Sequence, residues 1–224
     1  PIRIQSMTNT ATQDTEASVA QAKRVVDAGG EYVRLTAQGI KEAENLMNIN
    51  AGLRRDGYMV PLVADIHFNP KVADVAAQYV EKVRINPGNF SKDFDEASRQ
   101  LARLVVVCKE HGTAIRIGLN HGSLGERITN LYGNTPEAMA EAAMEWLRLC
   151  VKNDFYNVVV SLKSSNTYVM VEAYRLLAKK MQEEGVVFPL HVGVTEAGNG
   201  DSGRIKSCVG ISALLSEGLG NTIR

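Results

Sequence analysis

The sequence predicts an α/β protein that folds as a (β/α)₈ TIM-type barrel. Strand-like and helix-like stretches alternate along all 224 residues, as expected for βα units around a parallel sheet. Strand starts fall near residues 2, 32, 61, 83, 114, 158, 190 and 221, an average step of about 31 residues. Eight units typically take ~250 residues, so we expect the barrel to be truncated at the start of its eighth unit.

The first four units follow from apolar alternation and from residues typical of helix ends. Gly29 and Gly30 end the first helix, and Pro70 suits the first turn of the third. The predicted strands are Ile2–Met7, Tyr32–Thr36, Pro61–His67 and Val83–Asn86. The predicted helices are Asp14–Ala28, Ile40–Arg55, Pro70–Tyr79 and about Asp93–His111.

The second half continues the pattern after a long polar loop, Asn120–Asn134. Thr135 can cap the next helix and Pro136 can begin it. The predicted strands are Ala114–Leu119, Val158–Lys163, Leu190–Thr195 and a short Asn221–Arg224. The predicted helices are Thr135–Val151, Tyr168–Glu184 and about Ile205–Ser216. Since no linker or low-complexity segment divides the chain, we expect residues 1–224 to form one domain.

A doubly wound sheet is the alternative architecture for alternating βα units. Two features of the sequence disfavour it. No glycine-rich dinucleotide-binding turn follows the first strand, and polar residues occur on almost every strand. The barrel therefore remains the predicted fold.

Composition narrows the possible functions. Basic and acidic residues balance at 25 each and apolar residues make up 45%, so we expect a globular protein without a general affinity for nucleic acid or membranes. No apolar run reaches the ~20 residues of a membrane span. Three widely spaced cysteines, Cys108, Cys150 and Cys208, indicate a reducing, cytoplasmic location and no metal site in this chain.

Polar residues on the strands share one parity, which is typical of the inside of a barrel. The opposite parity is nearly all Ile, Val, Leu and Ala, as the helix-packing face requires. Val83–Asn86 shows the pattern most clearly, because Arg84 and Asn86 share one face before Pro87 and Gly88 end the strand. The residues expected at the inner face or the mouth are Gln5, Asn9, Arg34, Thr36, Asp65, His67, Arg84, Asn86, Arg116, Gly118, Asn120, Ser161, Lys163, His191, Gly193, Thr195 and Glu196.

Four of these residues are cations, Arg34, Arg84, Arg116 and Lys163, in a protein of zero net charge. Buried cations need partners. Two acidic residues, Asp65 and Glu196, leave positive charge in excess. A phosphate or diphosphate ligand held by arginine forks and a lysine accounts for that excess. An internal salt-bridge layer is the structural alternative.

Other polar residues are open to two interpretations. His67 could be a hydrogen-bonded core histidine or an acid or base, and His191 is expected near the barrel floor. Cys108 and Cys150 fit a helix core. The segment Gly198–Gly203 is either a flexible connection or an anion-binding loop that leads into a helix.

Several motifs together resemble the barrel domain of the (E)-4-hydroxy-3-methylbut-2-enyl diphosphate synthases, iron–sulfur enzymes of the non-mevalonate isoprenoid pathway. They occur in order over essentially the whole chain, and residues 198–207 are more similar to the longer, three-domain variety than to the two-domain one. The motifs are QSMTNT (5–10), PLVADIHF (61–68), RINPGN (84–89), IRIGLNHGSL (115–124), SLKSSN (161–166), YRLLAK (174–179) and HVGVTEAGNGDSGRIKS (191–207).

The resemblance implies reduction of 2-C-methyl-D-erythritol 2,4-cyclodiphosphate to the linear diphosphate. It implies that Glu196 acts in catalysis beside a [4Fe–4S] cluster. It also implies a homodimer and an electron donor of the flavodoxin or ferredoxin type. The residues implied in substrate binding are Arg34, Asp65, His67, Arg84, Asn86, Arg116, Asn120, Ser161, Lys163, Thr195, Arg204 and Ser207.

The cluster-binding C-terminal domain of that family has no counterpart in these 224 residues. We therefore expect a substrate-binding barrel that is inactive alone. Two other functions stay open from the residues: a pterin-binding synthase or methyltransferase barrel, which also uses Asp, Asn, Lys and Arg at strand ends, and a non-catalytic diphosphate-binding module.

Overall fold

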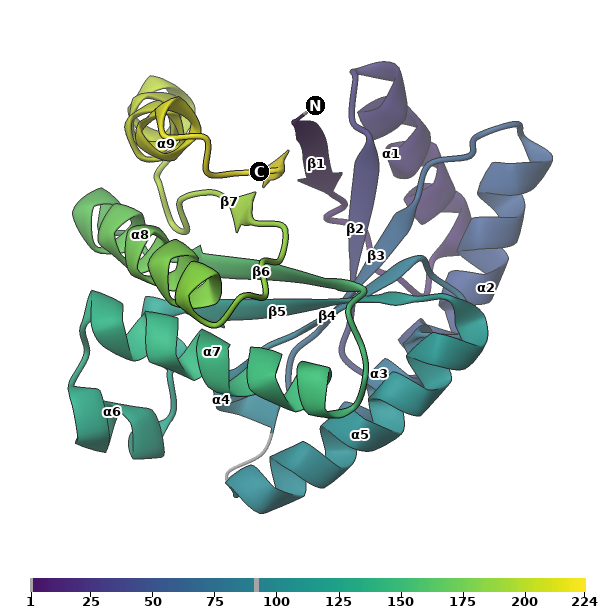
Figure 1. Ribbon diagram of the computed structural model, residues 1–224. Coiled ribbons are helices and arrows are strands. Elements are labelled where there is room, and N and C mark those ends of the chain that lie inside the picture. The colour runs from purple at the N-terminus through teal and green to yellow at the C-terminus, as the bar shows by residue number, and fades with distance from the viewer. Residues whose placement is uncertain (1, 91–92) are drawn as a thin grey trace.

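Eight parallel strands surrounded by helices make up the protein in the computed structural model, which describes residues 2–90 and 93–224 (Figure 1). The strands follow the order β6-β5-β4-β3-β2-β1-β8-β7. Their bounds are β1 Arg3–Met7, β2 Tyr32–Ala37, β3 Leu62–Ile66, β4 Lys82–Ile85, β5 Ala114–Asn120, β6 Val158–Lys163, β7 His191–Val192 and β8 Thr222–Ile223. The predicted barrel is confirmed.

The short strand β8 completes the sheet between β1 and β7. Thr222 pairs with Arg3 on one side and with His191 on the other. Between β6 and β7 the structure has an isolated parallel bridge that joins Val160 to Leu190. Pairing therefore continues around the whole ring, and the strand ends form one mouth.

The helices lie outside the strands, and most begin and end where local residues predict (Figure 1). Asp14 accepts a hydrogen bond from the Ala17 amide at the start of α1, and Thr135 caps α7 in the same way. The bounds are α1 Thr15–Asp27, α2 Ile40–Arg55, α3 Pro70–Ala76, α4 Pro87–Phe90, α5 Phe94–His111, η1 His121–Ser123 (a 3₁₀ turn), α6 Glu126–Tyr132, α7 Pro136–Lys152, α8 Thr167–Glu183 and α9 Gly200–Ser216.

Three local predictions are wrong. The expected loop Asn120–Asn134 contains η1 and α6, and Ile128 on α6 is buried against the core. Helix α9 begins at Gly200, five residues before the predicted start, so the segment Gly198–Gly203 is mostly helical. Strand β7 has two residues where six were predicted, because it forms few direct bonds with β6.

The predicted alternation of side chains is confirmed. The strand residues of apolar parity, such as Leu35, Ile85 and Ile117, are fully buried and join the helix-packing core. Arg84 and Arg116 are buried on the opposite face, inside the barrel. One face of each strand therefore stabilises the fold while the other builds the site.

Gly88 allows two strand-end loops to meet. A Cβ atom placed on Gly88 would lie 1.8 Å from the carbonyl oxygen of Ser123, closer than any side chain permits. The turn after β4 thus packs directly on the turn after β5. This contact fixes the mouth of the barrel beside Arg84 and Asn86.

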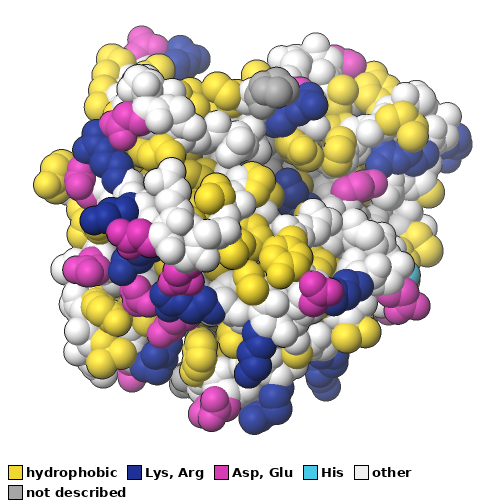
Figure 2. All heavy atoms as spheres, in the orientation of Figure 1, with side chains coloured by type: hydrophobic (Ala, Val, Ile, Leu, Met, Phe, Trp, Pro, Cys, Tyr) yellow, Lys and Arg dark blue, Asp and Glu magenta, His cyan; other side chains and the backbone are white. Residues whose placement is uncertain are grey.

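The surface carries acidic and basic side chains intermixed, without a segregated charge on the face shown in Figure 2. Arg148 of α7 illustrates the pattern, since it pairs with both Glu141 and Glu184. Among the described residues, no helix is long and apolar enough to cross a membrane. The equal numbers of acidic and basic residues are thus reflected in local ion pairs on the outside of the barrel.

We expect Thr113→Val to destabilise the fold by about 1–3 kcal/mol, because the buried Thr113 hydroxyl donates to the carbonyl oxygens of Ala77 (2.6 Å) and Val80 (3.2 Å), which would lose their donor. Urea unfolding of the chain measures the change. Thr129→Val is the control, since that exposed hydroxyl bonds only within its own helix turn. Equal stability of the two variants would contradict this account.

Candidate functional site

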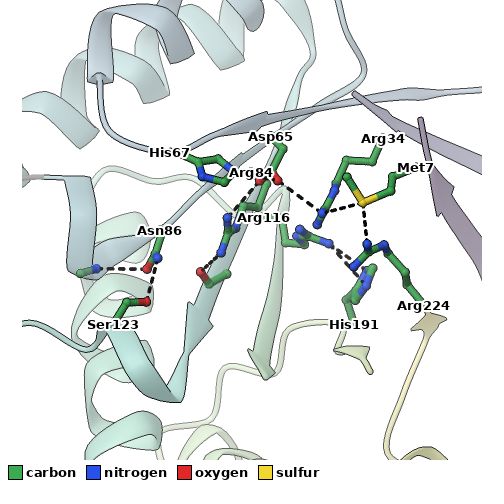
Figure 3. A network of polar contacts seen from close by, with 12 residues as sticks. Met7, Arg34, Asp65, His67, Arg84, Asn86, Arg116, Ser123, His191 and Arg224 are labelled. Atoms are coloured by element: carbon green, nitrogen blue, oxygen red, sulfur yellow. Dashed lines mark hydrogen bonds and ion pairs between the residues drawn. The ribbon is translucent and has the colours of Figure 1, made fainter. Parts of the chain in front are cut away.

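Four cations converge inside the barrel, and we call Arg34, Arg84, Arg116 and Lys163 the cation cluster. Figure 3 shows the three arginines around Asp65. They stand on β2, β4, β5 and β6. Arg84 pairs in register with Arg116 on the neighbouring strand. The predicted convergence of these side chains is confirmed.

Asp65 on β3 is the carboxylate at the centre of the arginines. Its Oδ1 lies 3.0 Å from Arg84 Nη1, and its Oδ2 lies 3.4 Å from Arg34 Nη2 and 3.2 Å from His67 Nε2. Burial acts to raise the pKa of Asp65, but the His67 hydrogen bond and the arginine charges hold that pKa well below its ordinary value. Asp65 is therefore an anion shared by two arginines and a histidine.

Gly118 gives Arg84 its position. The Arg84 guanidinium donates to the Gly118 carbonyl oxygen at 2.8 Å. A Cβ atom on Gly118 would lie only 2.5 Å from Arg84 Nε. A glycine at this inward position thus leaves room for the Arg84 guanidinium, which contacts Gly118 on β5 and Asp65 on β3 at the same time.

Arg116 faces an imidazole in place of a carboxylate. Its Nη1 lies 3.3 Å from His191 Nδ1, and its side chain is 2% exposed. Burial lowers the pKa of both Arg116 and His191, and neighbouring cations lower both further. His191 is consequently neutral at pH 7, and its unprotonated nitrogen can accept from the guanidinium.

Lys163 has no hydrogen-bond partner for its amine among the described residues. The residue is 6% exposed at the end of β6. Burial, followed by the charges of Arg116, Arg224 and Arg34, lowers its pKa well below the ordinary value. Such a group is costly unless a ligand pairs with it.

The structure contains elements of both interpretations of the buried cations, the internal salt-bridge layer and the anionic ligand site. Asp65 forms salt bridges with Arg34 and Arg84, so part of the predicted salt-bridge layer exists. Arg116 and Lys163 have no carboxylate partner in the described part of the chain. Positive charge therefore remains in excess inside the barrel.

Two further cations were missed from the sequence. Lys82 lies inside the barrel with its amine 4.3 Å from the centroid of the Tyr32 ring, and burial lowers its pKa to about 8. It has the parity of Arg84, but the strand was predicted to begin one residue too late to include it. The second missed cation is Arg224, which donates to the sulfur of Met7, as Arg34 does. The predicted terminal strand was too short to indicate the direction of this side chain.

A polar hollow of about 340 Å³ lies at the mouth beside Lys163, because its lining residue Asn120 pairs in register with that lysine and Ser164 follows it in the chain. Glu196 lines it in a left-handed conformation (φ 51°), and Thr195 precedes it. Among the described residues Glu196 forms no ion pair, so its predicted role as a partner of buried cations is wrong. The lining residues are Asn120, His121, Gly122, Ser123, Ser164, Ser165, Thr195 and Glu196.

The remaining predicted residues occupy varied places. Asn86 is buried, with its amide donating to Ser123 (3.0 Å) and its oxygen accepting from the Gly88 amide (3.2 Å), so it joins the two loops. Ser161 is buried near Gly118, and Ser207 is half-buried on α9. Arg204 has an 80% exposed side chain that pairs with Asp201 on the same helix, so its expected contact with an anion stays a prediction.

The described residues do not suit a metal or an iron–sulfur cluster. No group of three or more His, Cys, Asp or Glu side chains in residues 2–90 and 93–224 could hold a metal ion. Cys108 and Cys150 are buried, and burial raises the pKa of each thiol to about 12. Cys208 is exposed on α9. The helix-core interpretation of the first two cysteines is confirmed.

Comparisons with known proteins agree with the barrel fold. The sequence model of the GcpE TIM-barrel domain matches residues 1–224. A 4-hydroxy-3-methylbut-2-en-1-yl diphosphate synthase (flavodoxin) from Bacteroides fragilis is 64% identical, over 100% of this chain and 38% of that protein. The protein of the same name from Protochlamydia amoebophila is 48% identical, over 100% of this chain and 37% of that protein. The chain thus spans less than half the length of these relatives.

Solved structures share the fold at low sequence identity. The HMG-CoA lyase from Brucella melitensis has a TM-score of 0.63 and 16% identity, covering 99% of this chain and 79% of that chain. A dihydropteroate synthase from Xanthomonas albilineans, in complex with 7,8-dihydropteroate, has a TM-score of 0.62 and 12% identity, covering 100% of this chain and 86% of that chain. These similarities support the barrel alone.

We expect Lys163→Met to raise the free energy of unfolding by about 1–3 kcal/mol, because it replaces a buried, unpartnered amine by an apolar group of similar length. Urea unfolding at pH 7 measures the gain. Lys179→Met is the control, since that side chain is 74% exposed. A loss of stability in Lys163→Met would show that the amine has a stabilising partner.

The gain should also depend on pH. The lowered pKa of Lys163 means that the unfolded chain binds more protons than the folded chain between that pKa and the ordinary value of 10.5. The stability of the original chain therefore rises with pH through this window, and the advantage of Lys163→Met shrinks. A gain that grows with pH would contradict the assignment.

Proposed function

Because the chain belongs to the family of GcpE TIM-barrel domains, we propose that it is the substrate-binding barrel of a 4-hydroxy-3-methylbut-2-en-1-yl diphosphate synthase. The substrate would be 2-C-methyl-D-erythritol 2,4-cyclodiphosphate. Two electrons and two protons would open its ring, release water and leave the linear diphosphate. The cation cluster, with more positive charge than Asp65 balances, is the observation that supports a diphosphate ligand.

Electrostatics favour a polyanion at this place. Asp65 offsets only part of the charge of the two arginines that it joins. Arg116 and Lys163 then have donors and charge to offer a ligand. A diphosphate would accept from the guanidinium fork and the amine at once, and it would raise the pKa of Lys163 towards its ordinary value. Binding should therefore take up protons and weaken as the pH rises.

The polar hollow is suited to the non-phosphate end of the substrate. Thr195, Ser165 and Asn120 offer hydroxyl and amide groups to a hydroxylated carbon skeleton, and Glu196 lies exposed at the same place. We assign Glu196 to the reacting end as an acid or hydrogen-bonding group. Of the other predicted contacts, Ser161 and His67 adjoin the cluster, whereas Asn86 acts through the loops and Arg204 lies on the surface.

The redox partners would lie outside these residues. No described group of side chains fits a [4Fe–4S] cluster, so we expect the cluster, which would supply electrons, in a C-terminal domain beyond this chain. The names of the relatives specify flavodoxin, and we infer a donor of the flavodoxin or ferredoxin type. A homodimer of the longer protein stays a prediction, as does the cytoplasmic location.

The two alternatives make different demands on the same site. A pterin is a flat, largely uncharged heterocycle and needs no cluster of four cations, and the dihydropteroate synthase likeness extends to the fold alone. A non-catalytic diphosphate-binding module would use the cation cluster but not Glu196. Titration with the cyclic diphosphate and with a pterin distinguishes the proposed diphosphate site from a pterin site. The Glu196 variant distinguishes the proposed catalytic barrel from a non-catalytic binding module.

Arg116→Lys should weaken binding of the cyclic diphosphate roughly tenfold or more, because the charge stays but the guanidinium fork is lost. Calorimetry of the chain with this ligand measures the change. Arg99→Lys is the control, since Arg99 is largely exposed and pairs with Glu96 on its own helix. Unchanged affinity in Arg116→Lys would exclude a bidentate contact.

Glu196→Gln should lower turnover of the full-length protein much more than it changes substrate affinity, because the residue is assigned to the reacting end. Steady-state kinetics with the cyclic diphosphate give kcat and KM separately. Equal losses in both, or full activity, would remove Glu196 from this role and favour a binding module.

A further inference from the structure

The seam between β6 and β7 is the least directly bonded part of the ring. Val160 donates its amide hydrogen to the Pro189 carbonyl at 2.9 Å, beside the bridge from Val160 to Leu190. Further along, the Thr195 amide donates to the Ser164 carbonyl at 3.3 Å. The strand ends that carry Lys163 and His191 lie between these two contacts.

The hydroxyl of Tyr174 fills the gap in this seam. It accepts a hydrogen bond from the Leu162 amide at 2.9 Å and donates to the His191 carbonyl oxygen at 2.5 Å. In an uninterrupted parallel ladder that follows the Val160 bond, the Leu162 amide would donate straight to the His191 carbonyl. The hydroxyl is thus inserted into a backbone hydrogen bond and holds the strands apart there.

Tyr174 is well suited to such a contact. It stands on α8 (Thr167–Glu183) and is 0% exposed, so its ring is fixed by the packing between helix and strands. Burial raises the pKa of its hydroxyl, which keeps the proton available for the His191 carbonyl. Water could bridge the same groups but would be free to leave.

Both backbone partners of Tyr174 belong to site strands. Leu162 directly precedes Lys163, and the His191 ring contacts Arg116 at 3.3 Å. Gly193, two residues after His191, lies so close that a Cβ atom there would be 3.0 Å from the Lys163 amine. The width of the seam therefore decides where the lysine stands relative to Arg116.

We propose that Tyr174 is a positioning residue of the anion site, which sets the spacing of β6 and β7 and thereby places Lys163 and the His191–Arg116 pair for one diphosphate. This inference rests on the proposed function for the identity of the ligand. The phenol does not touch the ligand. Removing its hydroxyl either lets the strands close or leaves an amide and a carbonyl unpaired, and either change moves the lysine.

Calorimetry with inorganic pyrophosphate tests the proposal in Tyr174→Phe, Leu104→Ala, Tyr58→Phe and the original chain. We expect Tyr174→Phe to raise the Kd at least tenfold. Leu104→Ala removes a fully buried side chain from α5, away from the seam, and should leave the Kd within twofold despite its lower stability. Tyr58→Phe removes a surface hydroxyl that contacts Asp27 and should bind normally. Unchanged affinity in Tyr174→Phe, or an equal loss in Leu104→Ala, would overturn the positioning role.

Nuclear magnetic resonance separates failure of this inference from failure of the proposed function. In Tyr174→Phe, the Leu162 amide should exchange faster and the His191 ring nitrogens should change their chemical shifts, whether or not any ligand binds. If the original chain does not bind pyrophosphate, the proposed ligand is wrong while these shifts still test the seam. Unchanged exchange and shifts would overturn the inference by themselves.

Discussion

Excess positive charge inside the barrel has to be accommodated by every other part of the fold. Burying a cation without a partner is unfavourable, yet Arg116 and Lys163 are both buried without a carboxylate among the described residues. The apolar outer faces of the strands and the helices around them offset that cost through a continuous core. The fold can hold the charge because one parity of each strand stabilises it and the other is left for the ligand.

Strand pairing, a shared carboxylate and a glycine then fix the positions of the buried cations. The register of β4 with β5 places Arg84 beside Arg116, and Asp65 holds Arg84 and Arg34 at fixed distances. Glycine at position 118 leaves the space that the Arg84 side chain occupies. These contacts order most of the cation cluster before a ligand arrives, which lowers the entropy cost of binding.

The sequence predicts those parts of the molecule that depend on local periodicity. Alternation on the strands placed Arg34, Asp65, Arg84 and Lys163 correctly, since parity follows from the backbone alone. Features that depend on tertiary contacts were missed. The region around Ile128 became a helix because it packs on the core. Glu196 lies at the mouth and pairs with no cation in the part of the chain that the structure describes. Nothing near Tyr174 in the sequence reveals that its hydroxyl lies between two strands.

The seam at Tyr174 shows how the barrel combines rigidity with an adjustable site. A direct backbone bond between β6 and β7 would fix their spacing at the value common to all parallel strands. A side-chain hydroxyl from α8 makes that spacing depend on where the helix packs, so the position of Lys163 can be set independently of the other strands. The lysine lies at the boundary between the cation cluster, on β2 to β6, and the polar hollow, which extends to Thr195 and Glu196. A ligand with a charged end and a hydroxylated end has to contact both regions in one pose. The width of the seam sets the distance between the cation cluster and the polar hollow.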